Sequence, residues 1–431
     1  MRDSNLIQRH LAVQIQEALE VSRIVNVVGP RQSGKSTLVQ HQVPIAEYLT
    51  MDSDGIREAL RADAYSQLRL LADRQRSSDL PYLPIALDEV QRVPEITLAL
   101  KRIVDEDNVK GQFILTGSAD VFSLANAGDS LAGRVHTLIL RPLSAAEIHG
   151  VGPCQLLDIV DGAVAQVVHR LPTARPYTRA EALDLIVRGG FPEMRVLKDK
   201  QRMTRYSSYV DSLIVKDAPI VAPVRKPDVL RRLIDQLAAR TAQELNMAKL
   251  CDAVGARKET VGGWVDILER VCLVQRLPSW ASSATKRAIH WPKLHFLDTG
   301  CASALRNEKA TSFDLGADPT ALGPLLESFV YLELEKSLPA LNSPWQLSHW
   351  RSGRAEIDIV AENPGRNLAL FEVKATSKVS KADFNSINWF LEDGPGKAMA
   401  EKSVGFVVYL GDQLLSMGPG RICLPLSMFW S

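Results

Sequence analysis

The sequence predicts an α/β fold, with a parallel β-sheet covered by helices in its N-terminal part. Two observations lead to this prediction. Residues 1–150 alternate short, β-branched apolar runs with longer helical stretches, and such alternation is typical of a parallel sheet whose strands are joined by helices. A glycine-rich loop also stands between the first apolar run and the first helical stretch. The expected strands are residues 24–28, 47–51, 84–88, 112–116 and 136–140.

The glycine-rich loop, residues 29–36, has the complete pattern G-x-x-x-x-G-K-S. In a strand–loop–helix context this pattern binds phosphate, because the glycines let backbone N–H groups point at the anion and the helix N-terminus favours negative charge. Lys35 would reach the β- and γ-phosphates, and the Ser36 hydroxyl would hold Mg²⁺. A turn with an incidental lysine is the alternative. The residues expected around the nucleotide are Gly29, Pro30, Arg31, Gln32, Ser33, Gly34, Lys35, Ser36 and Thr37.

A second motif ends the third expected strand with two adjacent carboxylates, Asp88 and Glu89. Asp88 suits a position next to Mg²⁺, and Glu89 suits the group that orients and deprotonates an attacking water. A kinase would not need this glutamate, whereas a nucleotide hydrolase would. Alone, the pair is common at solvated strand ends, but the phosphate loop upstream favours the catalytic interpretation. Thr116, at the tip of the next strand, would touch the γ-phosphate or the water.

Composition sets limits on the whole chain. A length of 431 residues predicts two to four domains. The formal net charge is +1, so any nucleic-acid surface must be a local patch. The five cysteines are scattered without a C-x-x-C pattern, which indicates neither a zinc site nor a disulfide framework and suits a reducing cytoplasm. No apolar run approaches the ~20 residues of a membrane span, and we expect no membrane association.

The chain divides into four expected parts: residues 1–150, a helical segment at 151–221, a middle part at 222–300, and a C-terminal α/β part at 301–431. Amphipathic stretches and two short apolar runs in the middle part predict three helices and a small hairpin, the composition of a winged helix. The expected C-terminal elements are a helix at 325–338, strands at about 345–350, 356–361 and 367–373, a helix at 382–392 and a strand at 404–410.

The C-terminal part carries a candidate metal site. Glu372 and Lys374 lie two residues apart in an apolar strand and therefore share a face, where Asp358 from the neighbouring strand can meet them. Two carboxylates and a lysine can bind Mg²⁺ and activate a water. Glu327, on the preceding helix, would add a ligand. The alternative is an ion-paired strand face without a metal.

The middle part carries a local excess of positive charge, with 13 Lys and Arg against 7 Asp and Glu between residues 221 and 295. A helix–turn–helix is expected, with a glycine-containing turn at residues 254–256. Arg257 and Lys258, at the start of its second helix, would face a DNA groove or its phosphates. Lys286 and Arg287 would lie on the wing. The alternative is a winged helix used for packing or for protein contacts.

Several stretches together resemble one family, the bacterial and archaeal ATPases that join an AAA-type domain of the AAA_14 kind to a C-terminal region of the DUF4143 kind. The resemblance covers nearly the whole chain. The matching stretches are residues 29–37, Leu-Asp-Glu-Val-Gln at 87–91, Leu-Thr-Gly-Ser at 115–118, Leu-Ala-Gly-Arg at 131–134, Gly-Gly-Phe-Pro at 189–192 and His-Phe-Leu-Asp-Thr-Gly at 295–300.

The resemblance implies an ATPase core with a small helical lid at residues 151–221, in which Gly190 and Pro192 contact the nucleotide. It implies that Arg134 is either an arginine finger for a neighbouring subunit or the partner of a buried carboxylate. It further implies a homo-oligomer, of which a hexameric ring is one form. The C-terminal part resembles the PD-(D/E)xK nuclease fold, whose motif positions fall on Glu327, Asp358, Glu372 and Lys374.

The sequence therefore predicts a Mg²⁺-dependent ATP hydrolase that remodels or processes DNA, duplex or branched, with metal-dependent cleavage by the C-terminal part as a further expectation. The alternative is an ATP-controlled switch or assembly scaffold whose nuclease-like part only makes contacts. A small-molecule kinase is disfavoured because Glu89 is the residue that a hydrolase needs.

Overall fold

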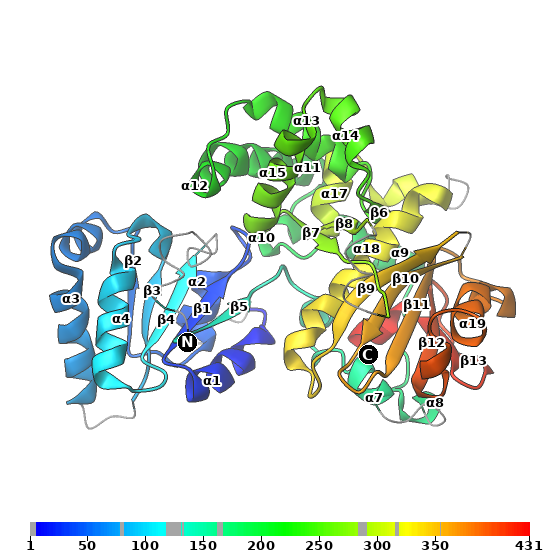
Figure 1. The fold of residues 1–431 in the computed structure, drawn as a ribbon, viewed down its shortest axis with the longest axis horizontal. Helices are drawn as coiled ribbons and strands as arrows, with labels where there is room; N and C mark the ends of the chain where they lie inside the picture. Colours follow the sequence, from blue (N-terminus) through cyan, green and yellow to red (C-terminus); the bar gives the residue numbers. More distant parts are fainter. Residues whose placement is uncertain are drawn as a thin grey trace. The chain divides into compact units, whose positions relative to one another are not determined.

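The structure is a computed structural model (Figure 1). It describes residues 6–77, 82–117, 131, 133–161, 167–282, 291–314, 319–353 and 355–431. The chain forms two compact units. The first comprises Met1–Pro142, Leu213–Val224 and Arg270–Cys272, and the second comprises Leu143–Ser212, Arg225–Glu269 and Leu273–Ser431. In the part of the chain that is described, no helix is long and apolar enough to cross a membrane.

The first unit is built on a five-stranded sheet with the order β2-β3-β4-β1-β5, and every neighbouring pair of strands is parallel. Its strands are β1 (Ile24–Val28), β2 (Glu47–Thr50), β3 (Ile85–Asp88), β4 (Phe113–Gly117) and β5 (Val135–Ile139). All five lie within one residue of the expected positions. The predicted α/β fold with a parallel sheet is therefore confirmed for this unit.

Helices cover both faces of this sheet because neighbouring residues of its strands point to opposite sides. In β3, Leu87 packs in the core beneath α3 and α4, while Ala86 packs in the core beneath α1 and α2. Both residues are fully buried. The helices are α1 (Leu11–Val21), α2 (Lys35–Gln42), α3 (Asp54–Arg76) and α4 (Ile96–Asp107).

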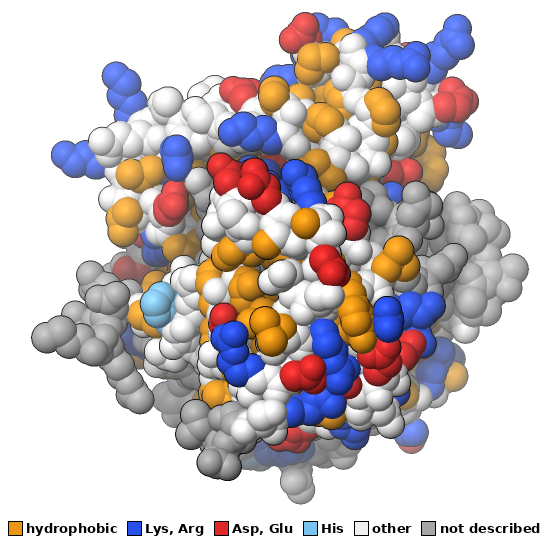
Figure 2. Space-filling view, turned by 90° about the vertical axis from the view of Figure 1, so that its left-hand side faces the viewer, with side chains coloured by type: hydrophobic (Ala, Val, Ile, Leu, Met, Phe, Trp, Pro, Cys, Tyr) orange, Lys and Arg blue, Asp and Glu red, His pale blue; other side chains and the backbone are white. Residues whose placement is uncertain are grey.

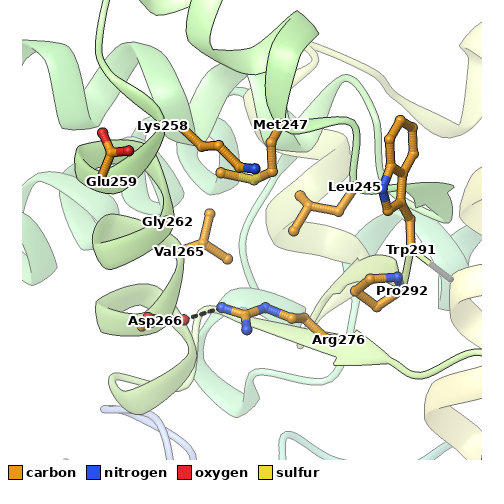
Figure 3. Close-up of a pocket in the computed structure, with 10 residues that line it drawn as sticks. All are labelled: Leu245, Met247, Lys258, Glu259, Gly262, Val265, Asp266, Arg276, Trp291 and Pro292. Atoms are coloured by element: carbon orange, nitrogen blue, oxygen red, sulfur yellow. Dashed lines mark hydrogen bonds and ion pairs between the residues drawn. The ribbon is translucent and has the colours of Figure 1, made fainter. Parts of the chain in front are cut away.

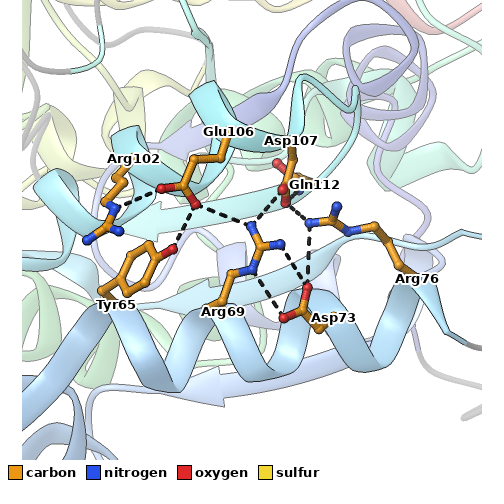
Figure 4. Close-up of polar contacts among 8 residues, drawn as sticks. All are labelled: Tyr65, Arg69, Asp73, Arg76, Arg102, Glu106, Asp107 and Gln112. Atoms are coloured by element: carbon orange, nitrogen blue, oxygen red, sulfur yellow. Dashed lines mark hydrogen bonds and ion pairs between the residues drawn. The ribbon is translucent and has the colours of Figure 1, made fainter.

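The outer surfaces of α3 and α4 are joined by a polar network (Figure 4). Arg69 of α3 lies 2.6 Å from the buried carboxylate of Asp107 on α4, which also pairs with Arg76. The Tyr65 hydroxyl donates to Glu106 over 2.7 Å. From the side on which α3 lies in Figure 1, basic and acidic side chains alternate across the described surface (Figure 2).

The second unit begins with a helical segment. Its helices are α6 (Ala145–His149), α7 (Leu156–Val160), α8 (Val167–Arg170), α9 (Arg179–Arg188), α10 (Pro192–Arg195) and α11 (Asp199–Ser212), after which the chain enters the first unit as a π-helical turn, Leu213–Asp217, and α12 (Ala218–Val221). We expected residues 151–221 as a lid of the ATPase core. Most of this segment groups with the second unit, because α9 and α11 pack against the later helix α17 (Thr299–Leu305). Its role as a lid stays a prediction.

The described residues of the middle part form the helices α13, α14 and α15 and a three-stranded antiparallel sheet of order β6-β8-β7. The expected helix–turn–helix is present: α14 ends at Gly255, whose φ of +67° favours glycine, and α15 follows. In chain order the elements are α13 (Pro227–Ala238), β6 (Gln243–Glu244), α14 (Met247–Val254), α15 (Lys258–Arg270), β7 (Val274–Leu277) and β8 (Lys293–Phe296).

The C-terminal part is a mixed six-stranded sheet of order β13-β14-β12-β11-β10-β9. Helix α19 packs on its apolar face, where Ile387 and Phe390 meet Ile357 and Leu370, and α18 packs against β11. We did not expect β13 and β14. The elements are α18 (Pro319–Ser337), β9 (Gln346–Ser352), β10 (Ala355–Glu362), β11 (Leu368–Lys374), α19 (Asn385–Glu392), β12 (Ser403–Tyr409), β13 (Leu415–Gly418) and β14 (Arg421–Pro425).

Candidate active site and the C-terminal carboxylate cluster

The phosphate loop connects β1 to α2, and both of its glycines are required by the backbone. Gly34 caps the N-terminus of α2 with a φ of +93°, which a residue with a side chain rarely adopts. Gly29 lies so close to the end of β5 that an added Cβ would stand 2.2 Å from the Leu140 carbonyl oxygen. The loop therefore curls tightly at the carboxyl end of the sheet, as phosphate binding needs.

Lys35 is buried and folds back over its own loop. Its Nζ donates hydrogen bonds of 2.9 Å to the carbonyl oxygens of Gly29 and Pro30. Burial lowers the pKa of Lys35, although the carboxylates of Glu89 and Asp88 oppose this shift. The ammonium thus lies inside the loop, at the place where a phosphate oxygen can replace a carbonyl as its acceptor.

Asp88, at the end of β3, accepts hydrogen bonds from three hydroxyl groups. Ser36 Oγ lies 3.1 and 3.2 Å from its two carboxylate oxygens, and Tyr48 donates over 2.5 Å. Thr116 donates to the same carboxylate. We expected Thr116 to face the γ-phosphate or the water, a role that stays a prediction. Tyr48 was missed, since its position in β2 shows no motif.

Glu89 directly follows β3 and has a φ of +58°. This left-handed conformation is uncommon for a residue other than glycine and is concentrated at functional sites. Gln91 Nε2 donates to its carboxylate. Burial raises the pKa of Glu89 above its ordinary value, while Lys35 opposes the shift. A partly buried carboxylate beside the phosphate loop has the properties of a general base.

The oxygens beside the loop fit a Mg²⁺ ion. A hydroxyl from Ser36 and a carboxylate from Asp88 are the hard oxygen donors that this ion takes, usually together with phosphate oxygens and waters. They are already in hydrogen-bond contact. The residues present are therefore compatible with the nucleotide-bound ion that the motif implies.

Arg31 and Arg9 hold the loop from outside. Arg31 Nε lies 2.6 Å from the buried carboxylate of Asp217, so Arg31, expected near the nucleotide, has an internal partner here. Arg9 donates over 2.7 Å to the Ser33 carbonyl and over 2.6 Å to the Arg141 carbonyl. Sequence reasoning missed Arg9, because no motif marks an arginine that binds carbonyl groups.

Arg134 forms a two-pronged ion pair with Asp105, with distances of 2.5 and 2.9 Å. The two alternatives for Arg134 were a finger for a neighbouring subunit and a partner for a buried carboxylate. It does pair with a carboxylate, but Asp105 is 37% exposed rather than buried. The finger role stays a prediction.

Gly190 and Pro192 lie in the second unit. The Gly190 N–H donates to Asp298 over 2.6 Å, and an added Cβ would stand 2.2 Å from the Leu143 carbonyl oxygen. Asp298 also accepts from Tyr206 over 2.8 Å and caps α17 through the Cys301 N–H. Gly190 therefore has a packing role in this structure, and its contact with nucleotide stays a prediction.

The C-terminal carboxylates gather around a lysine that we had not singled out. Lys293, in β8, is 2% exposed. Its Nζ lies 2.7 Å from Glu327, 2.7 Å from Glu356 and 3.5 Å from Asp358. Glu327 belongs to α18, and the other two belong to β10. The predicted site was made of residues from the C-terminal part alone, so it did not include a lysine from the middle part.

Glu372 and Lys374 complete the cluster. Lys374 Nζ lies 3.3 Å from Glu372, and Asp358 accepts from the Val373 N–H over 2.9 Å. The predicted proximity of Asp358, Glu372 and Lys374 is therefore present.

Proton binding in this cluster is strongly perturbed. Burial alone would lower the pKa of Lys293, but Glu327, Asp358 and Glu356 outweigh it and raise the pKa. Burial, and then repulsion from Asp358, raise the pKa of Glu327 well above its usual range. Burial and Asp358 also raise the pKa of Glu372 to about 8. The crowding of negative charge in a buried site favours the protonated form of Glu327 and Glu372, and it keeps the Lys293 amine in its charged, protonated form.

A metal site formed by Glu327, Asp358 and Glu372 stays a prediction. Among the described residues, which include all three, no group of three His, Cys, Asp or Glu side chains is arranged to hold a metal ion. The ammonium of Lys293 lies in contact with Glu327 and Asp358, two of the three expected ligands.

The start of α15 is exposed, as a nucleic-acid contact requires. Arg257 and Lys258 both lie at the surface. Lys286 and Arg287 lie outside the described residues. Beside α15 is a hollow of about 480 Å³ (Figure 3). Apolar side chains dominate its lining, and the Arg276–Asp266 ion pair lies at its edge. The lining residues are Leu245, Met247, Lys258, Glu259, Gly262, Val265, Asp266, Arg276, Trp291 and Pro292.

Models of three protein families match successive segments of the chain. Residues 21–149 match the family described as AAA domain, residues 179–312 match a domain of unknown function (DUF8612), and residues 322–429 match another (DUF4143). Uncharacterized proteins of Mycobacterium tuberculosis and Mycobacterium bovis are each 27% identical over 376 residues, covering 86% of this chain and 75% of theirs.

Two solved structures are similar at low identity. A Walker-type ATPase of Pyrococcus abyssi is 14% identical with a TM-score of 0.41, covering 71% of this chain and 97% of that one. AMPPCP-bound DnaA from Aquifex aeolicus is 14% identical with a TM-score of 0.30, covering 62% of this chain and 90% of that one. The phosphate loop, the Asp88–Glu89 pair and the family match agree that the chain carries an AAA-type P-loop ATPase domain at residues 21–149, and the segments that follow match the DUF8612 and DUF4143 families.

Proposed function

We propose that this ATPase is Mg²⁺-dependent and acts on DNA. The hydrolytic half of the proposal rests on one observation: Glu89, Asp88 and Lys35 meet at the carboxyl end of the sheet, with Glu89 close enough to Lys35 for each to shift the pKa of the other. The loop N–H groups and Lys35 would hold the phosphates. Glu89 would orient a water and take its proton.

Ser36 and Asp88 would hold the metal ion. The ion would supply positive charge that offsets the negative charge developing on the phosphates during hydrolysis. Tyr48 and Thr116 would keep the Asp88 carboxylate in place, since both donate hydrogen bonds to it.

The DNA half of the proposal is supported by the middle part. Its order α13-β6-α14-α15-β7-β8, with an antiparallel sheet, is the order that a winged helix has. Arg257 and Lys258 are exposed at the start of the second helix of the helix–turn–helix, where such motifs meet DNA. The local excess of six positive charges, 13 minus 7, adds attraction for a phosphate backbone.

A salt titration of DNA binding tests this half. Arg257→Ala combined with Lys258→Ala should weaken binding to duplex DNA and flatten its salt dependence. Each lost phosphate contact removes ~0.9 from the slope of log affinity against log salt concentration. The matched control is Lys200→Ala with Arg205→Ala, which removes two exposed charges from α11. Equal slopes for the two double variants would move the middle part to a packing or protein-contact role.

A second candidate is an ATP-controlled switch or scaffold with a non-catalytic C-terminal part. The specific observation in its favour is the apolar hollow beside α15, in which Trp291 is 52% exposed, because apolar hollows suit peptides or small molecules better than phosphates. ATP turnover measured with and without single-stranded, duplex and branched DNA separates the candidates. Stimulation by DNA supports the first, and turnover indifferent to every DNA form supports the second.

A further inference from the structure

Lys293 lies where a nuclease-like cluster would hold its metal ion. Its ammonium contacts Glu327 and Asp358, two of the three carboxylates expected as metal ligands, and Glu356 as well. An ammonium group has three N–H donors, and here three carboxylates surround it. The donors of Lys293 are therefore matched in number by the acceptors around them.

Two carboxylates of the cluster also have partners other than Lys293. Asp358 accepts the Val373 N–H, and Glu372 pairs with Lys374. A divalent ion would need several of these oxygens turned toward one point, at distances of about 2.0–2.6 Å. With Lys293 in place, that point is filled by a nitrogen atom which carries its own positive charge.

Lys293 and the carboxylates that surround it belong to different parts of the chain. It comes from β8 of the middle part, whereas Glu327, Glu356 and Asp358 come from α18 and β10 of the C-terminal part. All four belong to the second unit. Removing one partner from a buried ionic group is strongly unfavourable, so the cluster also fastens β8 to the C-terminal sheet.

We propose that Lys293 is the resident cation of the C-terminal cluster, and that it takes the place of a divalent metal ion. The C-terminal part then binds no divalent ion and cleaves no DNA while Lys293 is present. Replacing Lys293 by a neutral side chain opens a divalent-metal site made of Glu327, Glu356 and Asp358.

Binding of Mn²⁺ to the nucleotide-free full-length protein tests the proposal, with unbound Mn²⁺ counted by its paramagnetic resonance signal. Lys293→Met has nearly the same length without the charge, and it should bind about one Mn²⁺ more per chain than the wild type. Adding Asp358→Asn should remove that ion. Lys402→Met is the matched control: it removes an exposed lysine of the C-terminal part outside the cluster and should bind Mn²⁺ as the wild type does.

A melting experiment on the wild type keeps the test decisive if Lys293→Met does not fold. Replacing a chelator by excess Mn²⁺ should change the melting temperature of the wild type and of Asp358→Asn by the same amount. A Mn²⁺-dependent rise in the wild type that Asp358→Asn abolishes would overturn the proposal, because it places a metal ion in the cluster beside Lys293. A folded Lys293→Met protein that gains no Mn²⁺ would overturn it too. Any ion held at Ser36 and Asp88 is common to all variants and cancels.

Discussion

The strained backbone conformation of Glu89 sets the position of its side chain. A non-glycine residue held in the left-handed region costs about 1–3 kcal/mol, and Glu89 is in that region with a φ of +58°. The turn follows β3 immediately, so two adjacent residues at one strand end can both act at the phosphate loop. Asp88 meets Ser36, and Glu89 faces the charge of Lys35.

Substitutions at Glu89 and Lys35 should separate hydrolysis from binding. Glu89→Gln keeps the shape of the side chain and removes the base, so ATP should still bind while turnover falls by on the order of 10²–10⁴. Lys35→Ala should abolish binding, because it removes the cation inside the loop. Fluorescent-nucleotide titration and phosphate release measure the two effects. Glu95→Gln, at an exposed position nearby, is the control, and wild-type turnover by Glu89→Gln would refute the assignment.

At the scale of elements, two short motifs far apart in the sequence interlock. The Gly189–Gly190 pair follows α9, and Asp298 and Gly300 stand at the start of α17. An added Cβ would come within 2.2 Å of Asp298 Oδ1 at Gly189, and within 2.2 Å of the Arg188 carbonyl oxygen at Gly300. Glycine at these positions therefore lets α9 and α17 approach, with Asp298 accepting hydrogen bonds from both sides.

The interlock predicts a stability effect for Gly190→Ala. The new methyl group would clash with the Leu143 carbonyl oxygen, and overpacking of this kind costs about 1–3 kcal/mol. Gly263→Ala is the matched control, since nothing lies within 4 Å of its Cβ position and alanine favours the helix α15. Urea denaturation followed by tryptophan fluorescence should show a loss for the first and none for the second.

The same variant distinguishes packing from nucleotide contact. If Gly190→Ala unfolds as the wild type does but loses affinity for ATP, the expected contact between Gly190 and the nucleotide gains support and the interlock loses it. A loss of stability with unchanged affinity gives the opposite answer.

At the scale of the whole molecule, the open question is whether hydrolysis needs a neighbouring subunit. Arg134 is paired with Asp105 at the surface of the first unit. An ion pair at the surface contributes little to stability, because water and salt screen both charges. Such a pair can be exchanged for a contact with a nucleotide in another subunit at little cost in stability.

Mixing of inactive variants tests that role. If Arg134 acts in a neighbouring subunit, Arg134→Ala and Lys35→Ala proteins are each inactive alone, and their mixture should recover part of the ATPase rate, because each supplies what the other lacks. Specific activity should also rise with protein concentration. Asp105→Asn is the control: it removes the ion pair between Asp105 and Arg134 and should leave the rate unchanged. Full activity of Arg134→Ala alone, or no recovery together with a monomeric mass in ATP, would exclude the finger role.

Much of this protein was determined by local sequence. The strands β1–β5 and β9–β12 and the helix–turn–helix follow from the periodicity of apolar residues, which depends only on near neighbours. The phosphate loop and the Asp88–Glu89 pair could also be predicted from the sequence, because the backbone geometry of glycine and the ends of strands depend on near neighbours. β13 was not, since its four residues include no fully buried side chain and carry little of the pattern that marks a strand.

Only the tertiary structure decided which side chains meet. Lys293 reaches Glu327 across 34 positions and Asp358 across 65, and Gly190 reaches Asp298 across 108. The residues next to Lys293 in the sequence do not predict these partners, because the tertiary fold decides which distant side chains contact a buried charge. Glu327 and Asp358, which predicted a metal site, therefore contact the ammonium group of Lys293. An ammonium group and a metal ion both supply the positive charge that stabilises crowded carboxylates.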